Sequence, residues 1–376
     1  MRHRVLKVHQ DDNVVVALTN LSKDETITWN GDQFNVQENI PAKHKFVTQN
    51  LETGDPIYMY GVLVGKAQSP LKKGQLISTG NVKHASSDFV VGDRNTSWKQ
   101  PDVSKFKQKT FLGYHRADGS VGTANYWLVI PMVFCENRNL DVLQEALVKD
   151  LGYGRSRSYR LQAQQLIELY RAGKDVEEIL NADLQAGADA QPSQRLFPNV
   201  DGIKFLTHDG GCGGTRQDAQ ALCGLLAGYV THPNVAGATI LSLGCQNAQV
   251  SILQEEIQKR DPNFSKPLYV LEQQKIGMES DLVSHSIRQT FAGLMLANQN
   301  KREPAPLSKL CIGLECGGSD GFSGISANPA IGYTSDLLVA LGGSVILSEF
   351  PELCGVEQGL SAIWRSEERR VGKECR

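Results

Sequence analysis

Short runs rich in β-branched and aromatic residues, separated by polar turn residues, fill the first 84 residues and predict a small antiparallel β domain. The runs read NVVVAL, ETITWNGDQFNV, KHKFVTQN and PIYMYGVLVGKA, with turn residues between them. Asn30 and Gly31 form the dipeptide that is typical of a two-residue hairpin turn. Residues 85–108 are polar and without periodicity, so we expect a linker there, in which Trp98 docks on a neighbouring element.

From residue 109 the pattern changes to buried strand, Gly-rich turn and amphipathic helix, repeated several times. The predicted strands are the hydrophobic runs YWLVIPMVF, GIKFL, GATILSLG, KLCIGLE and SVILSEF. Hydrophobic residues with helical spacing follow, for example Leu140, Leu143 and Leu147. This alternation predicts an α/β domain with a parallel sheet.

Two stretches interrupt this alternation. Residues 155–180 predict an inserted pair of amphipathic helices, followed by a loop at residues 181–199. Residues 298–309 contain two prolines and predict a second linker.

The composition narrows the class of protein. The 376 residues carry a net charge of −2, which provides no basic excess for nucleic acid. The N-terminus lacks the apolar core of a secretory signal, and no hydrophobic run approaches the ~18 residues of a membrane helix. Eight cysteines without a CxxC pair do not indicate a disulfide framework. We therefore expect a soluble cytoplasmic protein with reduced thiols and neither nucleic acid nor membrane as a partner.

Most of the cysteines share one kind of position. Five of the eight lie just after a predicted strand: Cys135, Cys212, Cys245, Cys316 and Cys354. Ligands bind outside the carboxyl ends of the strands in an open α/β sheet, so we expect some of these thiols to share one rim. Cys223 and Cys311 fall elsewhere, and we expect both to pack as small hydrophobic residues.

The stretch THDGGCGGTRQDA at residues 207–219 concentrates the candidate chemistry. His208, Asp209 and Cys212 are plausible metal ligands, because a mixture of imidazole, carboxylate and thiolate suits iron or zinc. The glycines at 210, 211, 213 and 214 allow positive φ and close approach to a ligand. Thr215 and Asp218 form a capping pair, and the helix N-terminus with Arg216 suits a carboxylate.

A second Gly-rich turn, CGGSDG at residues 316–321, repeats this arrangement with Cys316, Ser319 and Asp320. Such turns also occur as tight turns without a functional role. Arg116 and Asn125, in the stretch YHRADGSVGTANYW, could also reach a site. No GxGxxG motif follows a strand with a later acidic residue, so a dinucleotide site is a poor fit. The GxxxxGK[ST] motif of a P-loop is absent. The GxSxG nucleophile elbow of a hydrolase is also a poor fit.

Several long stretches resemble the altronate/galactarate dehydratase family: VDGIKFLTHDGGCGGTRQDA, HPNVAGATILSLGCQN, LECGGSDGFSGISANPA and EFPELCGVEQ. The stretch IPAKHKFVTQNLETGDPIYMYGVLVGKA resembles the SAF (β-clip) domain of that family. The resemblance covers residues 1–363. It implies an α+β SAF domain at 1–84, a linker at 85–108, a middle dehydratase domain at 109–256 and the start of a C-terminal Rossmann-like α/β domain at 257–363, incomplete at its C-terminal end.

The resemblance also implies a metal-dependent hydro-lyase that converts D-altronate to 2-dehydro-3-deoxy-D-gluconate and water in hexuronate catabolism. Galactarate is the alternative substrate, Fe²⁺ the implied metal with Mn²⁺ as the alternative, and a homodimer the implied assembly. On this basis the catalytic residues would be His208, Asp209 and Asp320. The candidate metal ligands would be Cys212, Cys245 and Cys316. The substrate-binding residues would be Gly211, Gly213, Gly214, Thr215, Arg216, Asn247 and Ser319.

Two departures from the family pattern change this expectation. Many relatives carry a His-x-His-Asn run at the end of the SAF domain, where this chain has Ser78 and Gly80 in place of the histidines. Any ligand role of those histidines therefore does not carry over. Residues 364–376, WRSEERRVGKECR, do not resemble the family and predict a foreign tail on a truncated chain, the alternative being a genuine charged tail. Two competing hypotheses stay open. The chain could be an inactive fragment that only binds a sugar acid, or it could be an iron–sulfur protein whose cluster is held by cysteines.

Overall fold

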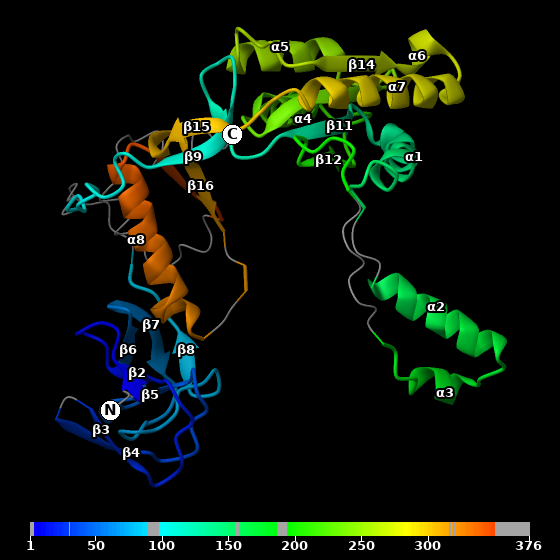
Figure 1. Ribbon diagram of the computed structural model, residues 1–376. Coiled ribbons are helices and arrows are strands. Elements are labelled where there is room, and N and C mark those ends of the chain that lie inside the picture. Colours follow the sequence, from blue (N-terminus) through cyan, green and yellow to red (C-terminus); the bar gives the residue numbers. More distant parts are fainter. Residues whose placement is uncertain are drawn as a thin grey trace. The chain divides into compact units, whose positions relative to one another are not determined.

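The computed structural model describes residues 4–29, 31–88, 98–154, 158–185, 194–315, 317–318 and 321–349. The chain divides into two compact units, one of residues 1–108 and 310–376 and the other of residues 109–309 (Figure 1). The predicted foreign tail at 364–376 lies outside the described residues. None of the described helices combines the length and the hydrophobicity of a membrane span.

The N-terminal region consists of short antiparallel strands, as the β-rich runs predict. One sheet contains β1 (Val5–Leu6), β2 (Val14–Ala17) and β5 (Lys45–Val47). A second contains β6 (Pro56–Met59), β7 (Val62–Ala67) and β8 (Val82–His84). The predicted hairpin joins β3 (Thr26–Trp29) to β4 (Asp32–Asn35), and Trp29 pairs with Asp32 across the turn.

Two hydrophobic clusters fill this region. Phe34, Ile40 and Phe46 are buried in one, and the rings of Phe34 and Phe46 meet edge to face with centroids 5.7 Å apart. Ile57 and Leu71 are buried in the other. Successive side chains of a strand point to opposite faces. β6 buries one face, with Ile57 and Met59, whereas all four residues of β2 are buried.

The unit of residues 109–309 is built on a four-stranded parallel sheet, which confirms the parallel α/β prediction. Its order is β12-β11-β13-β14. The strands are β11 (Tyr126–Pro131), β12 (Gly202–Phe205), β13 (Val235–Ser242) and β14 (Leu268–Glu272). The domain boundary predicted after residue 256 falls inside this unit, because β14 pairs with β13.

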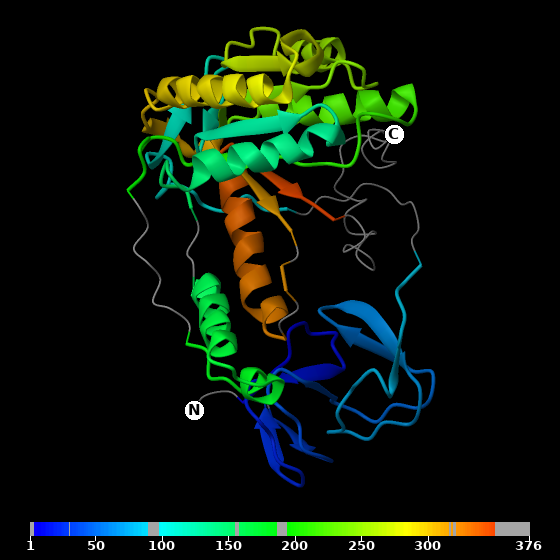
Figure 2. The same ribbon diagram turned by 90° about the vertical axis from the view of Figure 1, so that its right-hand side faces the viewer.

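Helices cover both faces of this sheet (Figure 2). α1 (Asn137–Val148) and α7 (Glu279–Ala297) pack on one face. α4 (Arg216–Thr231) and α5 (Val250–Arg260) pack on the other, and the short α6 (Gln273–Ile276) precedes α7. Leu140, Leu143 and Leu147 are buried, as their spacing predicts. Cys223 is also buried as predicted, and its burial, together with the neighbouring Glu256 carboxylate, raises its pKa to about 11.

An antiparallel sheet of β10 (Val121–Gly122), β9 (Thr110–His115) and β15 (Glu303–Pro306) belongs to the same unit, and the 3₁₀ turn η2 (Leu307–Lys309) follows β15. The linker predicted at 298–309 is therefore wrong for residues 303–306, which pair with β9. Two prolines fit there because β15 is an edge strand, where a missing N–H breaks no central ladder.

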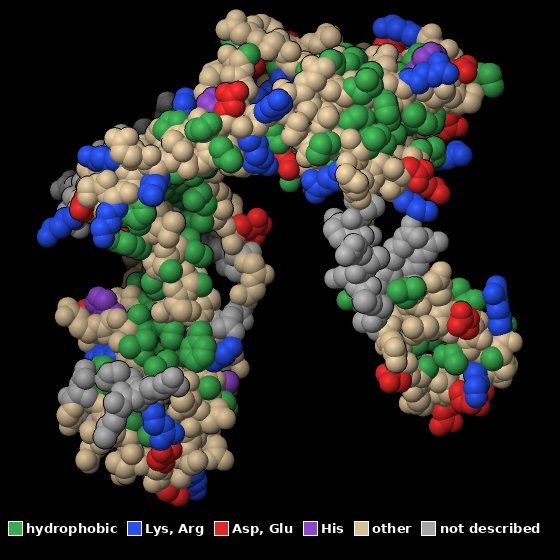
Figure 3. Space-filling model, viewed as in Figure 1, with side chains coloured by type: hydrophobic (Ala, Val, Ile, Leu, Met, Phe, Trp, Pro, Cys, Tyr) green, Lys and Arg blue, Asp and Glu red, His purple; other side chains and the backbone are tan. Residues whose placement is uncertain are grey.

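The predicted helical insertion is present as α2 (Ser158–Arg171) and α3 (Val176–Leu180). Tyr159, Tyr170 and Leu180 are exposed on it. Figure 3 shows hydrophobic side chains mixed with acidic side chains on this helical pair.

Residues 311–347 form a parallel β-α-β unit of β16 (Cys311–Leu314), α8 (Ala327–Ala340) and β17 (Ser344–Leu347), with the 3₁₀ turn η3 (Ser323–Ile325) before α8. Trp98 docks on it as expected, because its Nε1–H donates to Asp336 Oδ1 at 2.9 Å. Cys311 was expected to be packed, but it is exposed. The reason is that β16 pairs only with β17 within the described part of the chain, so its outward side chains are not covered.

Candidate functional site

The strand order creates a topological switch point at the carboxyl ends of β11 and β13. The chain leaves β11 through α1 to reach β12 on one side, and it leaves β13 through α5 to reach β14 on the other. Because α1 and α5 lie on opposite faces, the loops after β11 and β13 separate there. Ligands of open α/β sheets bind in the crevice at such a point. We name the loops after these strands the β11 loop (132–136), the β12 loop (206–215) and the β13 loop (243–249).

Hydrogen bonds join these three loops. The Phe134 N–H of the β11 loop, which includes the 3₁₀ turn η1 (Phe134–Glu136), donates to the Gly210 carbonyl at 3.0 Å. The Ala248 N–H of the β13 loop donates to the Gly211 carbonyl at 3.1 Å. Asn137 Nδ2 donates to the His208 carbonyl at 2.9 Å. The β12 loop is therefore fixed between its two neighbours.

Glycine is required at two positions of the β12 loop. Gly211 has a φ of +97°, and a Cβ there would lie 2.2 Å from the Met132 carbonyl oxygen. Gly214 has a φ of +91°. Gly210 and Gly213 do not adopt positive φ, so the expectation of positive φ holds for two of the four glycines.

His208 is committed to the backbone. Its Nε2 lies 2.7 Å from the Pro131 carbonyl oxygen, and its Nδ1 accepts from the Gly210 N–H at 3.2 Å. Nε2 therefore carries the proton of a neutral ring, and neither nitrogen has a lone pair free for a metal. The expectation that His208 is a metal ligand is not supported by this arrangement.

Asp209 and Arg216 are exposed, and neither side chain has a hydrogen bond or ion pair with any described residue. The backbone N–H groups of Cys212, Gly213 and Gly214 also lack an acceptor within the described chain. These donors lie at the N-terminus of α4, where the helix dipole favours an anion. The arrangement can bind a carboxylate.

Thr215 instead holds the helix. Its hydroxyl accepts from the Asp218 N–H at 3.1 Å and donates to Asp218 Oδ2 at 2.9 Å, as predicted for a capping box. The hydrogen bonds from Thr215 lower the pKa of Asp218. The cap occupies the Thr215 hydroxyl, which was expected to bind substrate. Asn247 lies nearby, with its Nδ2 3.5 Å from the Gly214 carbonyl.

Three thiols converge on the switch point. Cys135, Cys212 and Cys245 come from the β11, β12 and β13 loops, and all three are exposed free thiols. Desolvation and the neighbouring thiols of Cys212 and Cys245 raise the pKa of Cys135. No group of three or more His, Cys, Asp or Glu side chains in the described residues has the arrangement that holds a metal ion. The set His208, Asp209 and Cys212 therefore does not fit a single ferrous ion here.

Two residues at this rim were not among the site residues expected from sequence. Cys135 joins the thiols already named, and its signal was its position directly after a strand. Glu136 is buried, and its Oε2 accepts from Asn139 Nδ2 at 2.7 Å, whereas Oε1 has no partner in the described structure. Burial, with the nearby Glu279, raises the pKa of Glu136.

The second Gly-rich turn cannot be compared with the β12 loop, because Cys316, Ser319 and Asp320 lie outside the described residues. Cys354 also lies outside them.

Arg116 and Asn125 do not reach this rim. Asn125 directly precedes β11 and therefore lies at the opposite, amino end of the sheet. Arg116 donates to Asn125 Oδ1 at 3.0 Å and to the Pro233 carbonyl at 2.7 Å. Both residues belong to a structural network there.

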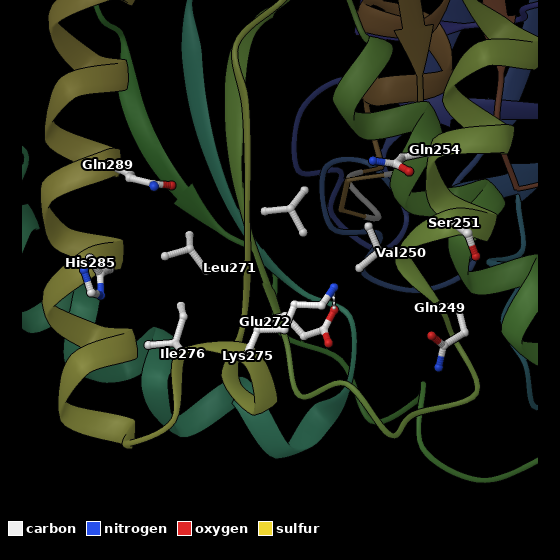
Figure 4. A pocket seen from close by; sticks show the side chains of 11 residues that line it. Gln249, Val250, Ser251, Gln254, Leu271, Glu272, Lys275, Ile276, His285 and Gln289 are labelled. Carbon is white, nitrogen blue, oxygen red and sulfur yellow. Dashed lines mark hydrogen bonds and ion pairs between the residues drawn. The ribbon is translucent and has the colours of Figure 1, made fainter.

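A cavity of ≈ 690 Å³ opens beside the β13 loop, between α5, β14, α6 and α7 (Figure 4). Gln249 lines it and donates to the carbonyl of Gln246, which is buried and braces the β13 loop. Glu272 and Lys275 form an ion pair of 2.9 Å at the cavity. His285 and Gln289 of α7 face it from the opposite side. This mixed polar lining suits a polyhydroxylated ligand.

Comparison with known proteins identifies the family. The model of the D-galactarate dehydratase/altronate hydrolase second domain matches residues 113–298. The model of the altronate/galactarate dehydratase SAF domain matches residues 3–85, and that of the D-galactarate/altronate dehydratase C-terminal domain matches residues 307–375.

Curated relatives agree. Altronate dehydratase of Bacillus subtilis (strain 168) is 30% identical over 94% of this chain and 61% of its own length. Altronate dehydratase of Escherichia coli (strain K12) is 28% identical over 96% of this chain and 63% of its own length. Galactarate dehydratase (L-threo-forming) of Escherichia coli (strain K12) is 28% identical over 93% of this chain and 59% of its own length. The chain thus spans about three fifths of these relatives. Since three domain models of one family match in succession along the chain, this protein belongs to the altronate/galactarate dehydratase family.

Proposed function

We propose that this chain dehydrates a sugar acid, converting D-altronate to 2-dehydro-3-deoxy-D-gluconate and water, with galactarate as the alternative substrate. The observation that carries the proposal is the 30% identity to an altronate dehydratase over 94% of the chain. Hexuronate catabolism, a cytoplasmic location and a homodimer are parts of the same proposal.

The reaction sets three chemical requirements. The C2–H bond breaks, although its proton is poorly acidic beside a carboxylate anion. The C3–O bond breaks as the hydroxyl leaves as water, which requires a proton donor. The resulting enol then takes a proton at C3 to become the 2-keto acid. A site for this reaction therefore needs a base, an acid and donors for the charge that develops on the carboxylate.

The β12 loop supplies the donors in our proposal. The free N–H groups of Cys212, Gly213 and Gly214 and the N-terminus of α4 receive the substrate carboxylate. Arg216 adds a charged, bidentate contact to the same group. Gly211 keeps the loop close to the end of β11, and Asn247 contacts the loop from the other side. As the enediolate forms, its growing negative charge faces these donors.

Asp209 is our candidate for the base at C2, because its carboxylate is exposed and without a partner in the described chain. His208 acts as a positioning residue, because its ring is bound to the Pro131 carbonyl and the Gly210 N–H. Asp320 and Ser319 stay proposed as catalytic and substrate-binding residues of the second Gly-rich turn. Fe²⁺, or Mn²⁺ as the alternative, stays part of the proposal from the family resemblance, but we assign no step to a single ion, because His208, Asp209 and Cys212 do not fit one here.

The test is an anaerobic assay with D-altronate and, separately, galactarate, in which the 2-keto-3-deoxy acid is measured. Bacillus subtilis altronate dehydratase serves as the positive control. Asp209→Asn should lower kcat about 100-fold or more, and Arg216→Gln should mainly raise KM. Asp141→Asn is the matched control, because Asp141 is exposed on α1 and without a described partner. If the positive control is active and this chain converts neither substrate, the proposed activity is wrong for this chain.

A further inference from the structure

The clearest feature that the proposed reaction leaves unused is the group of three thiols. Cys135, Cys212 and Cys245 follow three adjacent strands of one parallel sheet, β11, β12 and β13. All three are exposed and unpaired by disulfides. The carboxyl ends of adjacent parallel strands lie at the same edge, so the topology alone brings the three residues to one rim.

The loops that carry these thiols are fixed in place next to one another. The Phe134 N–H, one residue before Cys135, donates to the Gly210 carbonyl at 3.0 Å. The Ala248 N–H of the β13 loop donates to the Gly211 carbonyl, one residue before Cys212, at 3.1 Å. Gly211 also packs against the Met132 carbonyl with no room for a Cβ. The thiols therefore share one prearranged rim.

The residue types narrow the ligand to a soft metal centre. Thiolates select zinc, copper(I) and iron–sulfur clusters. A structural zinc ion requires four close ligands in a tetrahedron, and no group of three suitable side chains among the described residues is arranged to hold one ion. A cluster differs, because each thiolate binds a different iron and the sulfur atoms can stand further apart.

We propose that Cys135, Cys212 and Cys245 hold an iron–sulfur cluster of the [4Fe–4S] type. On binding, each thiol loses its proton and its sulfur bonds one iron. Three thiolates would leave the fourth iron without a ligand from the described residues. The site does not depend on which sugar acid is dehydrated, and it needs no nitrogen of His208, whose ring is bound to the backbone.

The test uses the whole chain, purified anaerobically and incubated with equal amounts of Fe²⁺ and Fe³⁺, with sulfide and a thiol, so that the two ferrous and two ferric ions of the [4Fe–4S]²⁺ state are supplied without a further oxidant. We expect a broad visible absorption that dithionite bleaches, with about four iron and four acid-labile sulfide per chain. Cys135→Ser, Cys212→Ser and Cys245→Ser should each lower bound iron and sulfide about tenfold or more. Cys311→Ser is the matched control, because Cys311 is an exposed free thiol on another strand, β16. This variant should bind as much iron and sulfide as the unmodified chain.

Three outcomes would overturn the proposal: iron bound without sulfide, stoichiometric zinc in place of iron, or a cluster that survives all three substitutions. Urea unfolding of each variant tests whether loss of the cluster reflects loss of the fold. The metal analysis is then repeated on the double variant Cys135→Ala/Cys245→Ala, which has smaller side chains. None of these measurements uses a sugar acid. A chain that holds the cluster but converts no substrate would contradict the proposed function alone.

Discussion

The two edges of the parallel sheet in residues 109–309 use polar residues in opposite ways. At the amino edge, Asn125 is fully buried, and its amide donates to the carbonyls of Asn199 and Ala297, both at 2.9 Å. At the carboxyl edge, Asp209 and Arg216 are exposed and have no partner among the described residues. Both edges are rich in polar side chains. The carboxyl edge satisfies some of them, such as His208 and Thr215, but leaves the charged groups of Asp209 and Arg216 without a partner in the described chain.

This difference separates a structural network from a binding site. Buried polar groups are tolerated when the protein itself supplies their hydrogen bonds, as it does around Asn125. Donors and thiols that the protein leaves without partners are available to a ligand. The parallel arrangement places the free N–H groups of helix N-termini at the carboxyl edge, so open donors for an anion occur at that edge.

The largest expected effect is on stability at the amino edge. Asn125→Ala removes one donor from each of the Asn199 and Ala297 carbonyls and one acceptor from Arg116, and it leaves a cavity where the amide was fully buried. We expect the free energy of unfolding in urea to fall by about 3 kcal/mol. Asn247→Ala, at the exposed carboxyl edge, is the control and should change it by less than about 0.5 kcal/mol. Equal losses for the two variants would remove the contrast between the edges.

A pH effect at the amino edge is the next largest. Lys266 Nζ donates to the Thr231 and His232 carbonyls at 2.9 and 2.8 Å. Burial, with the nearby Arg116, lowers the pKa of Lys266 to about 8. In the unfolded chain Lys266 keeps its proton up to a pH of about 10. Between pH 8 and 10 the unfolded chain therefore binds more protons than the folded chain. The contribution of Lys266 to the free energy of unfolding then rises with pH, by on the order of 2 kcal/mol.

The measurement is urea unfolding at several pH values between 7 and 10. Lys266→Met is the comparison. Lys266 helps to lower the pKa of His232 and of Asp118, but both groups titrate below this pH range. The stability of the unmodified chain should rise relative to that of the variant over this range. A constant difference between the two curves would show that Lys266 does not titrate as described.

At the carboxyl edge, Gly211→Ala tests whether the β12 loop needs its conformation. The new Cβ would lie 2.2 Å from the Met132 carbonyl oxygen, at a φ of +97°. We expect a loss of about 2 kcal/mol in the free energy of unfolding and a fall of about tenfold or more in sugar-acid turnover, because the loop must move. Gly228→Ala in α4 is the control, since no atom lies within 4 Å of its Cβ, and it should stabilise the chain by about 0.5–1 kcal/mol. Similar stability and turnover in the two variants would argue against a strained, positioned loop.

The smallest effect concerns the helix cap beside the open donors. Thr215→Ala removes the hydroxyl that accepts from the Asp218 N–H and should cost about 1 kcal/mol of unfolding free energy. Thr215→Ser keeps the hydroxyl and should restore most of it. If Thr215→Ala instead raises KM without changing the urea midpoint, the hydroxyl binds substrate and is not mainly a cap.

Much of the fold was predictable because burial leaves periodic patterns. The β-rich runs of the N-terminal region and the spacing of Leu140, Leu143 and Leu147 identified strands and a helix that the structure contains. Residues 303–306 were missed as a strand, because proline is rare in strands and only the edge position of β15 permits it. Cys311 was expected to be buried, but residue type cannot show how many neighbours a strand has.

The site was predictable in its location and less so in its residue roles. The positions of Cys135, Cys212 and Cys245 after strands pointed to a shared rim, and Thr215 with Asp218 predicted its cap. His208 appeared to be a free ligand in sequence, but a backbone carbonyl and an N–H group, at Pro131 and Gly210, occupy both ring nitrogens. Arg116 and Asn125 looked reactive, yet they face one another at the opposite edge.

The sequence by itself determined the kinds of element, the strand-end positions of the thiols and the family, because local periodicity and residue order are properties of the chain. Only the tertiary structure decided which strand ends are neighbours, since the order β12-β11-β13-β14 differs from the order along the chain. It also decided which polar groups are satisfied. Hydrogen bonds such as those of His208 and Asn125 join residues that are 77 and 172 positions apart, and no local pattern records them.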